Sequence, residues 1–390
     1  MSTLRIGIVG LGNMGGTHAR AILAGKIPRT NLTAVCDHVP ARLAAFAEVP
    51  GFTHHRDLIA SGLVDAVIVA TPHFDHTVVG AAVLAAGLHV LIEKPLSVHK
   101  ADCEKLIAAY AARPHRHQVF AEMFNQRTDP RYRQLKELIT SGELGEIRRI
   151  SWIITDWFRT EAYYASGDWR ATWSGEGGGV LMNQCPHQLD LMTWLFGMPT
   201  RVRAHLRFGA YHDIEVEDAA TAYLEYANGA TGTFITTTGE APGTNRLEVA
   251  AERGRVIIDG EGLQWIRNAT PMTAFSQTTK ESFAKPPTWQ VNIPTQGFGD
   301  QHNGILTNFT AAILDGAALI GPAHEGIHGV ELANAMLMSQ LWDRTVYLPL
   351  DSAAVTQEYQ RLIAASRRKT STASVTSSAD FAQSMNGGAV

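Results

Sequence analysis

The stretch Leu4-Arg5-Ile6-Gly7-Ile8-Val9-Gly10-Leu11-Gly12-Asn13-Met14-Gly15 decides the fold of this chain. Its first half is apolar and rich in β-branched residues, which predicts a buried strand. Its second half matches the pattern GxGxxG, and the helical pattern of residues 14–24 follows directly. A glycine motif alone is weak evidence, but a strand before it and a helix after it predict a nucleotide-binding turn.

The residues of this turn have separate tasks. Gly10 permits the tight turn, Gly12 lets the backbone approach a pyrophosphate, and Gly15 allows close packing of the helix on the strand. Asn13 and Met14 open the helix, whose free N–H groups and positive dipole end attract phosphate. The turn is therefore the predicted pyrophosphate site of a dinucleotide.

The first third of the chain continues this pattern. Strand-like runs alternate with helical runs, which predicts a parallel sheet with helices on both faces. We expect an α/β Rossmann domain, a doubly wound parallel sheet, over residues 1–122. Its further strands are predicted at 32–37, 66–70, 89–93 and 118–121, and its further helices at 41–48, 57–61, 77–86 and 99–112.

The rest of the chain predicts a different architecture. Long runs that alternate in period two are joined by turns such as Asn228-Gly229, which indicates a large, mostly antiparallel sheet. We expect an α+β domain over residues 123–350, a C-terminal helix over 351–369 and a disordered tail over 370–390. The predicted strands are 147–156, 201–208, 219–226, 230–238, 246–251, 255–259 and 263–268, after a helix at 131–141.

One face of this large sheet is expected to stay open. Helices predicted at 177–196, 303–314 and 331–342 would cover the other face. A broad, partly apolar sheet face usually packs against another molecule. We therefore expect a homodimer or homotetramer that forms through the open face.

Composition excludes several classes of function. The net charge of −4 supplies no basic surface for nucleic acid. Cysteines Cys36, Cys103 and Cys185 form no CxxC pair, and we find no HxxxH or HExxH spacing on a coherent helix, so we expect no metal. The sequence contains no apolar run long enough to span a bilayer and no leader pattern. We expect a cytoplasmic protein with no membrane partner.

Asp37 indicates which dinucleotide binds. It ends the second predicted strand, 22 positions after Gly15. A carboxylate there accepts hydrogen bonds from ribose hydroxyls and repels a 2′-phosphate, which favours NAD over NADP. Arg42 and His38 lie close enough in sequence to weaken that exclusion. The alternative is that Asp37 caps the following helix.

Further cofactor contacts are expected where the run 66–70 ends. Ligands of open parallel sheets bind beyond the carboxyl ends of the strands. Thr71, Pro72, His73 and His76 follow this run, so we expect them to line the cofactor. A histidine at such a place also serves as a cap or a packing residue, and for His76 the sequence leaves that alternative open.

A family resemblance rests on further motifs. Together with the glycine turn and Thr71-Pro72, the tripeptide Glu93-Lys94-Pro95 resembles the Gfo/Idh/MocA family, named for glucose–fructose oxidoreductase and inositol dehydrogenase. The segment Gly177-Gly178-Gly179-Val180-Leu181-Met182-Asn183-Gln184-Cys185-Pro186-His187-Gln188-Leu189-Asp190 is similar to the second signature of that family, and Glu331–Met336 to a third stretch. The resemblance covers roughly residues 4 to 350.

The resemblance implies a two-domain enzyme that moves a hydride between a carbinol carbon and nicotinamide. Lys94 would then lie beside the cofactor with Glu93, and partial desolvation would lower its pKa, so that it could exchange a proton. His187 is the predicted partner that binds the reacting hydroxyl and acts as, or helps, the base. The alternatives are a solvated Lys94 and a structural His187.

Asn183 departs from one pattern of the family. Inositol-dehydrogenase-like members carry an aspartate four positions before the histidine, and this chain has an amide. An amide donates and accepts hydrogen bonds but cannot share a proton. Asn183 would therefore orient the substrate or the imidazole, and Lys94 and His187 would move the proton. Asp190, on the same helical face, would hold a neighbouring group.

An aromatic and cationic stretch is expected to bind the substrate. Sugar rings present apolar C–H faces that pack on aromatic rings, while their hydroxyls need polar partners. Tyr163, Trp169 and Trp173 supply the rings, although Trp173 could equally be core. The resemblance places Arg170 near both nicotinamide and substrate. We also expect Arg127 at the substrate and Asn125 at the cofactor, because both follow the last strand of the first domain.

The sequence supports three functions. The first is an NAD-dependent dehydrogenase that oxidises a secondary hydroxyl of a sugar, glycoside or cyclitol, for example C3 of a glucoside. The second is an NAD-dependent glycosidase that oxidises transiently, eliminates the aglycone and reduces back. The third is a non-catalytic sugar sensor, which the presence of Lys94 and His187 disfavours.

Overall fold

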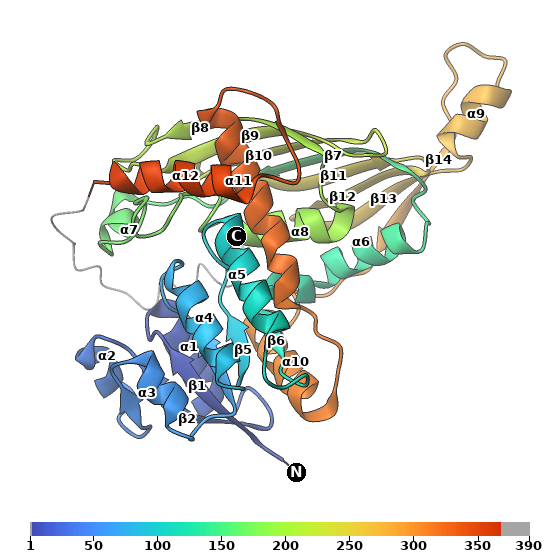
Figure 1. Cartoon of the computed structure of the whole chain (residues 1–390). Helices are drawn as coiled ribbons and strands as arrows, with labels where there is room; N and C mark the ends of the chain where they lie inside the picture. Colours follow the sequence, from blue (N-terminus) through green and yellow to red (C-terminus); the bar gives the residue numbers. More distant parts are fainter. Residues whose placement is uncertain (1, 368–390) are drawn as a thin grey trace.

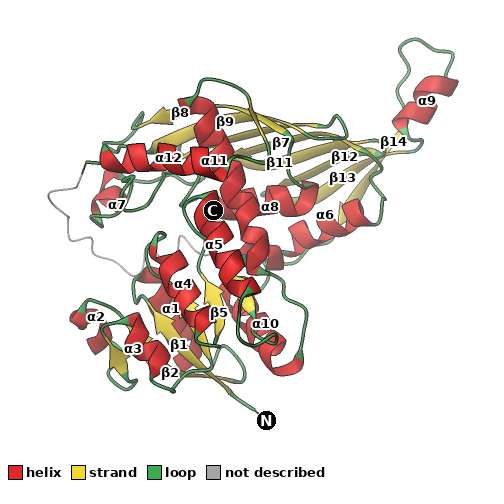
Figure 2. Ribbon diagram, viewed as in Figure 1, coloured by secondary structure: helices red, strands yellow, loops and turns green. Residues whose placement is uncertain are grey.

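The computed structural model describes residues 2–367, and its first sheet has the expected parallel arrangement. The strands of this sheet are β1 (Leu4–Val9), β2 (Thr30–Cys36), β3 (Gly51–Phe52), β4 (Ala66–Val69), β5 (His89–Ile92) and β6 (Phe120–Glu122). They lie in the order β3-β2-β1-β4-β5-β6, and all neighbouring pairs are parallel. Figure 2 shows β1, β2 and β5 of this sheet among the helices of the domain. From β1 the chain adds β2 and β3 on one side of the sheet and then β4, β5 and β6 on the other. Ligands of such sheets bind where the strand order switches, here at the carboxyl ends of β1 and β4.

Helices lie on both faces of this sheet. On one face, Ile22 of α1 (Asn13–Leu23) is buried in one apolar cluster with β1. On the other face, a second cluster contains Val83 of α4 (Asp75–Ala85) together with buried residues of α5 (Lys100–Ala111). The doubly wound Rossmann prediction is therefore confirmed. Two short helices complete the domain, α2 (Pro40–Ala44) and α3 (His55–Ala60).

Helix α10 (Gln301–Asp315) corrects one expectation. The helix predicted at 303–314 is present, but it packs on the first sheet and not on the second. Its Ile305, Leu306 and Phe309 are buried in the same cluster as β1 and α1. Helical periodicity reveals that a helix has an apolar face, but it does not reveal which sheet receives that face.

The second sheet has nine strands and is mostly antiparallel, as predicted. Its order is β14-β13-β12-β11-β7-β10-β9-β8-β15, and only the β7–β10 pair is parallel. The strands are β7 (Ile147–Ile154), β8 (Arg201–Phe208), β9 (Glu217–Glu225), β10 (Thr231–Thr237), β11 (Asn245–Ala251), β12 (Gly254–Asp259), β13 (Gly262–Asn268), β14 (Thr288–Ile293) and β15 (Val346–Tyr347).

Helices cover one face of the second sheet and leave the other open (Figure 1). Trp152 of β7 and Phe234 of β10 point to the covered face and are fully buried there. On the opposite face, no helix of residues 2–367 covers the strands (Figure 1). The helices of this domain are α6 (Pro130–Thr140), α7 (Glu161–Ala165), α8 (Pro186–Phe196), α9 (Met272–Thr278), α11 (Gly326–Leu341) and α12 (Ser352–Ala364), with short 3-10 turns η1 (Asn125–Thr128) and η2 (Ala323–Glu325).

Lys100, at the start of α5, joins the two domains. Its backbone N–H donates to Asn334 Oδ1 at 3.0 Å, and its ammonium lies 2.9 Å from Glu331 and 2.7 Å from the carbonyl oxygen of Leu350. Asn334 and Glu331 belong to α11, so this buried contact fixes α11 against the first domain. The stretch that resembles the third family motif therefore has a structural role here.

The described residues include only part of the C-terminal region. The helix expected at 351–369 is α12, which ends at Ala364, and the tail expected at 370–390 lies outside the described residues. Between residues 2 and 367, none of the helices combines the length and the apolar character that crossing a membrane requires.

Candidate active site

The glycine turn has the geometry that a dinucleotide needs. Gly10 has φ +92°, and a Cβ atom there would lie 2.5 Å from the carbonyl oxygen of Ala70. A Cβ atom at Gly15 would collide with the carbonyl oxygen of Gly10, whereas one at Gly12 would meet nothing within 4 Å. Helix α1 begins after Gly12 with no side-chain cap and no acidic residue in its first turn. Its N–H groups are therefore free to bind a pyrophosphate, and the turn fits NAD.

Asp37 is held against this turn by backbone N–H groups. Leu11 donates to its Oδ2 at 2.7 Å and Val39 to its Oδ1 at 2.8 Å, while the Arg42 guanidinium lies 3.3 Å away. The N-terminal end of α2 has no side-chain cap, so Asp37 does not serve as that helix cap. The carboxylate is thus fixed beside the turn, with a cation next to it.

We predict that Asp37→Ser lowers kcat/KM with NAD by about tenfold or more, because ribose loses a charged hydrogen-bond acceptor. The same change should raise kcat/KM with NADP, because Arg42 is freed to pair with a 2′-phosphate. Steady-state kinetics with both cofactors measure the two effects. Asp57→Ser, at an exposed carboxylate of α3, is the control. An unchanged preference would contradict the assigned role.

Lys94 lies at the carboxyl end of β5, between two carboxylates. Its Nζ donates to the carbonyl oxygen of Asn183 at 2.7 Å. Burial lowers the pKa of Lys94, while the charges of Glu93 and Glu176 oppose that fall. Glu93 is itself occupied, because its Oε1 lies 2.6 Å from His18 Nε2 and its Oε2 accepts from the Lys94 backbone N–H at 3.2 Å. Although burial acts in the opposite direction, the bond to His18 holds the pKa of Glu93 at about 2.

The glycine run brings Asn183 to Lys94. Glu217 of β9 accepts from the N–H groups of Gly179 at 2.9 Å and Leu181 at 3.1 Å, and its backbone leaves no space for a Cβ atom at Gly179. These contacts hold residues 177–185 in turns, so the helix predicted at 177–196 begins only at Pro186. The expectation that Asn183 shares a helical face with His187 is therefore wrong.

His187 lies in the first turn of α8 and is 8% exposed. Its Nδ1 is buried without a partner among the described residues. Burial lowers the pKa of His187 well below the ordinary value, and the positive charges of Lys94 and His302 lower it further. The imidazole is consequently neutral near pH 7 and able to form a hydrogen bond with a hydroxyl.

Tyr163 joins the predicted substrate residues. Its hydroxyl lies 3.0 Å from Arg170 Nη1, 3.2 Å from Asn183 Nδ2 and 3.1 Å from Gln184 Nε2. The Arg170 guanidinium also lies over the rings of Tyr163 and Trp169, at 4.7 and 4.5 Å from their centroids. The structure thus brings Tyr163, Trp169, Arg170 and Asn183 together near Lys94.

Sequence reasoning missed Glu176 and His302. Glu176 is 2% exposed, and its carboxylate accepts from the Ala171 N–H at 2.6 Å and from the Asn183 side-chain amide. Its position inside the run Ser174-Gly175-Glu176-Gly177 was a signal, because a carboxylate in a buried glycine-rich turn needs a partner. For His302 no local signal existed.

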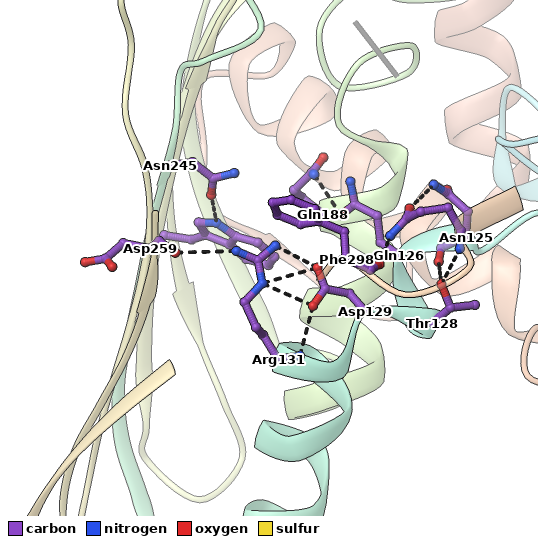
Figure 3. A network of polar contacts seen from close by, with 11 residues as sticks. Asn125, Gln126, Thr128, Asp129, Arg131, Gln188, Asn245, Asp259 and Phe298 are labelled. Atoms are coloured by element: carbon purple, nitrogen blue, oxygen red, sulfur yellow. Dashed lines mark hydrogen bonds and ion pairs between the residues drawn. The ribbon is translucent and has the colours of Figure 1, made fainter. Parts of the chain in front are cut away.

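Hydrogen bonds between α10 and η1 hold His302 near the site. Asn125 Nδ2 donates to Gln301 Oε1 at 2.7 Å, and Thr128 Oγ1 accepts from the Gln301 N–H at 2.9 Å; Figure 3 shows Asn125 and Thr128 in this network. The next residue, His302, has its ring centroid 5.9 Å from that of His18. Burial lowers the pKa of His302 to about 4.

Several predicted residues lie outside this group or are already engaged. Arg127 is 3% exposed and pairs with Asp190 and Glu325. Trp173 is buried beside Phe208. Both nitrogens of His76 meet carbonyl oxygens, Pro95 at 2.8 Å and Thr71 at 2.9 Å.

Three predicted cofactor residues remain near the end of β4. His73 Nδ1 lies 3.0 Å from the carbonyl oxygen of Glu176, and its ring meets Trp169 edge-on. Thr71 Oγ1 is buried without a hydrogen-bond partner among the described residues. Pro72 follows Thr71 and is partly exposed. An unpartnered hydroxyl at the end of β4 suits a ligand that supplies its partner.

One sequence spacing that is typical of metal ligands does occur in this chain. His324-Glu325-Gly326-Ile327-His328 has the HExxH pattern, but it is split between η2 and α11. Both histidines are exposed, and Glu325 pairs with Arg127. Within residues 2–367, no group of three or more His, Cys, Asp or Glu side chains is arranged to hold a metal ion.

Two family profiles match most of the described chain. Residues 4–124 match "Oxidoreductase family, NAD-binding Rossmann fold", and residues 132–257 match "GFO/IDH/MocA C-terminal domain". Similar proteins include an inositol 2-dehydrogenase of Leifsonia xyli subsp. xyli, 31% identical over 50% of this chain and 54% of that protein. The rhizopine catabolism protein MocA of Rhizobium meliloti is 32% identical over 52% of this chain and 61% of that protein. The matched region thus spans little more than half the length of these curated relatives.

Solved structures give a longer match. The WlbA dehydrogenase of Bordetella pertussis, crystallised with NADH and UDP-GlcNAcA, is 25% identical, with a TM-score of 0.76. That comparison covers 90% of this chain and 100% of the other.

Proposed function

Because the chain belongs to the Gfo/Idh/MocA family of NAD-binding oxidoreductases, we propose that it is an NAD-dependent dehydrogenase of a sugar, glycoside or cyclitol. It would oxidise a secondary ring hydroxyl, for example at C3 of a glucoside. The observation that carries this proposal is the meeting of Lys94, His187 and Asn183 at the crevice beside the glycine turn. Lys94 belongs to the first domain, while Asn183 and His187 belong to the second. Two buried polar groups with lowered pKa values, where the charge of one lowers the pKa of the other, are typical of functional sites.

Oxidation of a secondary alcohol removes a hydride from carbon and a proton from oxygen. Bound nicotinamide supplies the hydride acceptor. In the proposed mechanism, the neutral amine of Lys94 receives the hydroxyl proton at Nζ, and the neutral imidazole of His187 holds the same hydroxyl in place. Asn183 and Tyr163 orient neighbouring hydroxyls, and the rings of Tyr163 and Trp169 exclude water from the C–H face of the sugar.

We propose a structural role for the predicted site residues that already pack against or bind other parts of the protein. We assign Arg127, Trp173 and His76 to holding the site together. The side-chain polar atoms of Arg127 and His76 already have protein partners, and the Trp173 ring is buried beside Phe208. Glycines Gly10, Gly12 and Gly15, with Asn13, Met14, Asp37, Thr71 and Pro72, remain the proposed cofactor residues. His73, Glu93, Asn125 and Arg170 would position the nicotinamide end.

One experiment separates the candidate functions. Purified protein is incubated with NAD and a panel of inositols, free sugars, aryl glycosides and levoglucosan, while NADH absorbance and aglycone release are followed. A UDP-sugar belongs in the panel, because the similar WlbA dehydrogenase was crystallised with UDP-GlcNAcA. We expect NADH to accumulate with at least one secondary alcohol. Aglycone release without NADH would support the glycosidase, and the absence of both signals would support the sensor.

We further propose that the chain forms a homodimer or homotetramer through the open sheet face. Ile153 and Ile235 lie on this face in the middle of the sheet, and the ion pair of Arg149 with Glu248 lies near them. Such an apolar centre with a polar surround is typical of subunit interfaces. Sedimentation of a monomer at micromolar concentration would end this proposal.

A further inference from the structure

Glu176 occupies the centre of the candidate site, although it is absent from the predicted set. One carboxylate oxygen accepts from the backbone N–H of Ala171, a non-glycine residue with φ +51°. The other accepts from the side-chain amide of Asn183. The Arg170 guanidinium lies 4.0 Å from the same oxygen. A side chain that is 2% exposed and held on three sides is fixed in one orientation.

The contacts of Asn183 connect this carboxylate to Lys94. The amide of Asn183 donates to Glu176, while the backbone carbonyl of the same residue accepts from Lys94 Nζ at 2.7 Å. Glu176 therefore fixes the residue that holds the ammonium. It also acts on Lys94 directly, because its negative charge opposes the effect of burial on the pKa of Lys94.

The other charges around Lys94 do not replace Glu176. Glu93 is the second nearby carboxylate, but His18 binds it at 2.6 Å. Lys94 also acts on the buried thiol of Cys185. The remaining groups that act on Lys94, or on which Lys94 acts, are cationic or become cationic when protonated: Arg170, Arg159, His73, His187 and His302. Without Glu176, the site would hold an excess of positive charge around the ammonium.

We propose that Glu176 is a positioning residue that supplies a negative charge to Lys94 and holds Asn183, whose carbonyl oxygen binds the Lys94 ammonium. The hydrogen bond between the Glu176 carboxylate and the Asn183 amide keeps both near Lys94. This inference rests on the proposed function for its catalytic meaning. The charge relation between Glu176 and Lys94 is a property of the protein alone.

In the proposed reaction, the alcohol loses a hydride to the nicotinamide and a proton to Lys94, which becomes an ammonium ion. Glu176 stabilises that ammonium and keeps Nζ directed at the hydroxyl. Burial raises the pKa of Glu176, while Arg170, the Ala171 N–H, the Asn183 amide and Lys94 oppose that rise. In the proposed step the proton goes to Lys94, and Glu176 acts through its charge. The ammonium then returns its proton to solvent before the next turnover.

The first test needs neither substrate nor cofactor. The protein is labelled with ¹³C-lysine, and the Cε resonance of Lys94, assigned by its absence in Lys94→Ala, is followed against pH. Glu176→Gln keeps the shape of the side chain and removes the charge, so the pKa of Lys94 should fall by about one unit or more. Glu215→Gln is the matched control, because Glu215 also accepts a backbone N–H, from Trp173 at 2.7 Å, and is not among the charges that act on Lys94.

The decisive variant moves the negative charge from residue 176 to residue 183. In Glu176→Gln with Asn183→Asp, the hydrogen bond is reversed and one carboxylate is restored near Lys94. We expect the pKa of Lys94 to return towards the wild-type value. With a substrate found in the panel, the acid limb of the kcat/KM profile should move to lower pH in Glu176→Gln and return in the double variant. Thermal melting of each variant monitors folding.

Two outcomes would overturn the inference. The first is a Lys94 titration that is the same in wild type and in folded Glu176→Gln. The second is a shift in Glu176→Gln that the double variant does not reverse. Failure of the proposed function gives a different result, since no substrate of the panel would then produce NADH while the titration shift remained.

Discussion

Turnover of Lys94→Ala is expected to fall by at least about a hundredfold, the usual contribution of a positioned general base. The expected loss is in kcat, because the variant lacks the acceptor for the hydroxyl proton and retains the glycine turn. NAD should bind to the variant almost as tightly as to the wild type. This separation follows from the structure, where Lys94 Nζ contacts Asn183 of the second domain and no part of the pyrophosphate site.

Single-turnover kinetics give the rate of NADH formation, and calorimetry gives the affinity for NAD. Lys105→Ala is the matched control, because Lys105 lies on the exposed side of α5, where it pairs with Asp102. Its kinetics should equal those of the wild type. Near-normal turnover of Lys94→Ala would remove Lys94 from the mechanism.

Arg127→Ala is expected to lower the free energy of unfolding by about 3–5 kcal/mol, the range for breaking a buried ion pair by removal of one partner. Arg127 Nε and Nη2 donate to the two carboxylate oxygens of Asp190 at 2.9 and 2.6 Å. Nη1 donates to Glu325 at 2.5 Å and to the carbonyl oxygen of Ile320 at 3.2 Å. The substitution leaves Asp190, which is 3% exposed, without its cation.

Urea unfolding measures this loss. Arg131→Ala is the control, because the Arg131 side chain in the first turn of α6 is 17% exposed, against 2% for Arg127, and pairs with Asp129 two positions away (Figure 3). Its loss should cost less. The double variant Arg127→Met with Asp190→Leu should recover part of the stability, because it removes both charges together. Normal stability with a raised KM would instead favour the substrate contact that the sequence suggested for Arg127.

The fold was largely predictable from local pattern. Strand β1, the glycine turn and α1 follow from one stretch of sequence, and period-two alternation predicted the strands from β7 to β13. The short strands β3 and β15 were missed because two residues carry no periodicity. Strand β14 was missed because it lies at an edge and exposes Trp289, so it has no buried face to mark it.

The candidate site was predictable only where a motif marked it. Lys94 and His187 came from motifs, and in the structure both are buried close enough for the charge of Lys94 to lower the pKa of His187. Glu176 depends on a turn that brings it to Asn183, which lies only 7 positions later, and no periodic pattern marks such a turn. His302 depends on a contact with His18, which is distant in sequence. Arg127 shows the converse limit: its position after β6 suggested a ligand contact, but the acidic partners that occupy it come from α8 and η2.

Because α10 packs on the first sheet, the nucleotide-binding domain cannot be expressed intact as a simple N-terminal fragment. A fragment that stops after β6 would lack Ile305, Leu306 and Phe309, and would expose to solvent the apolar surface that they cover. Such a truncated nucleotide domain should aggregate on expression, whereas a fusion that carries residues 301–315 on a linker should stay dispersed.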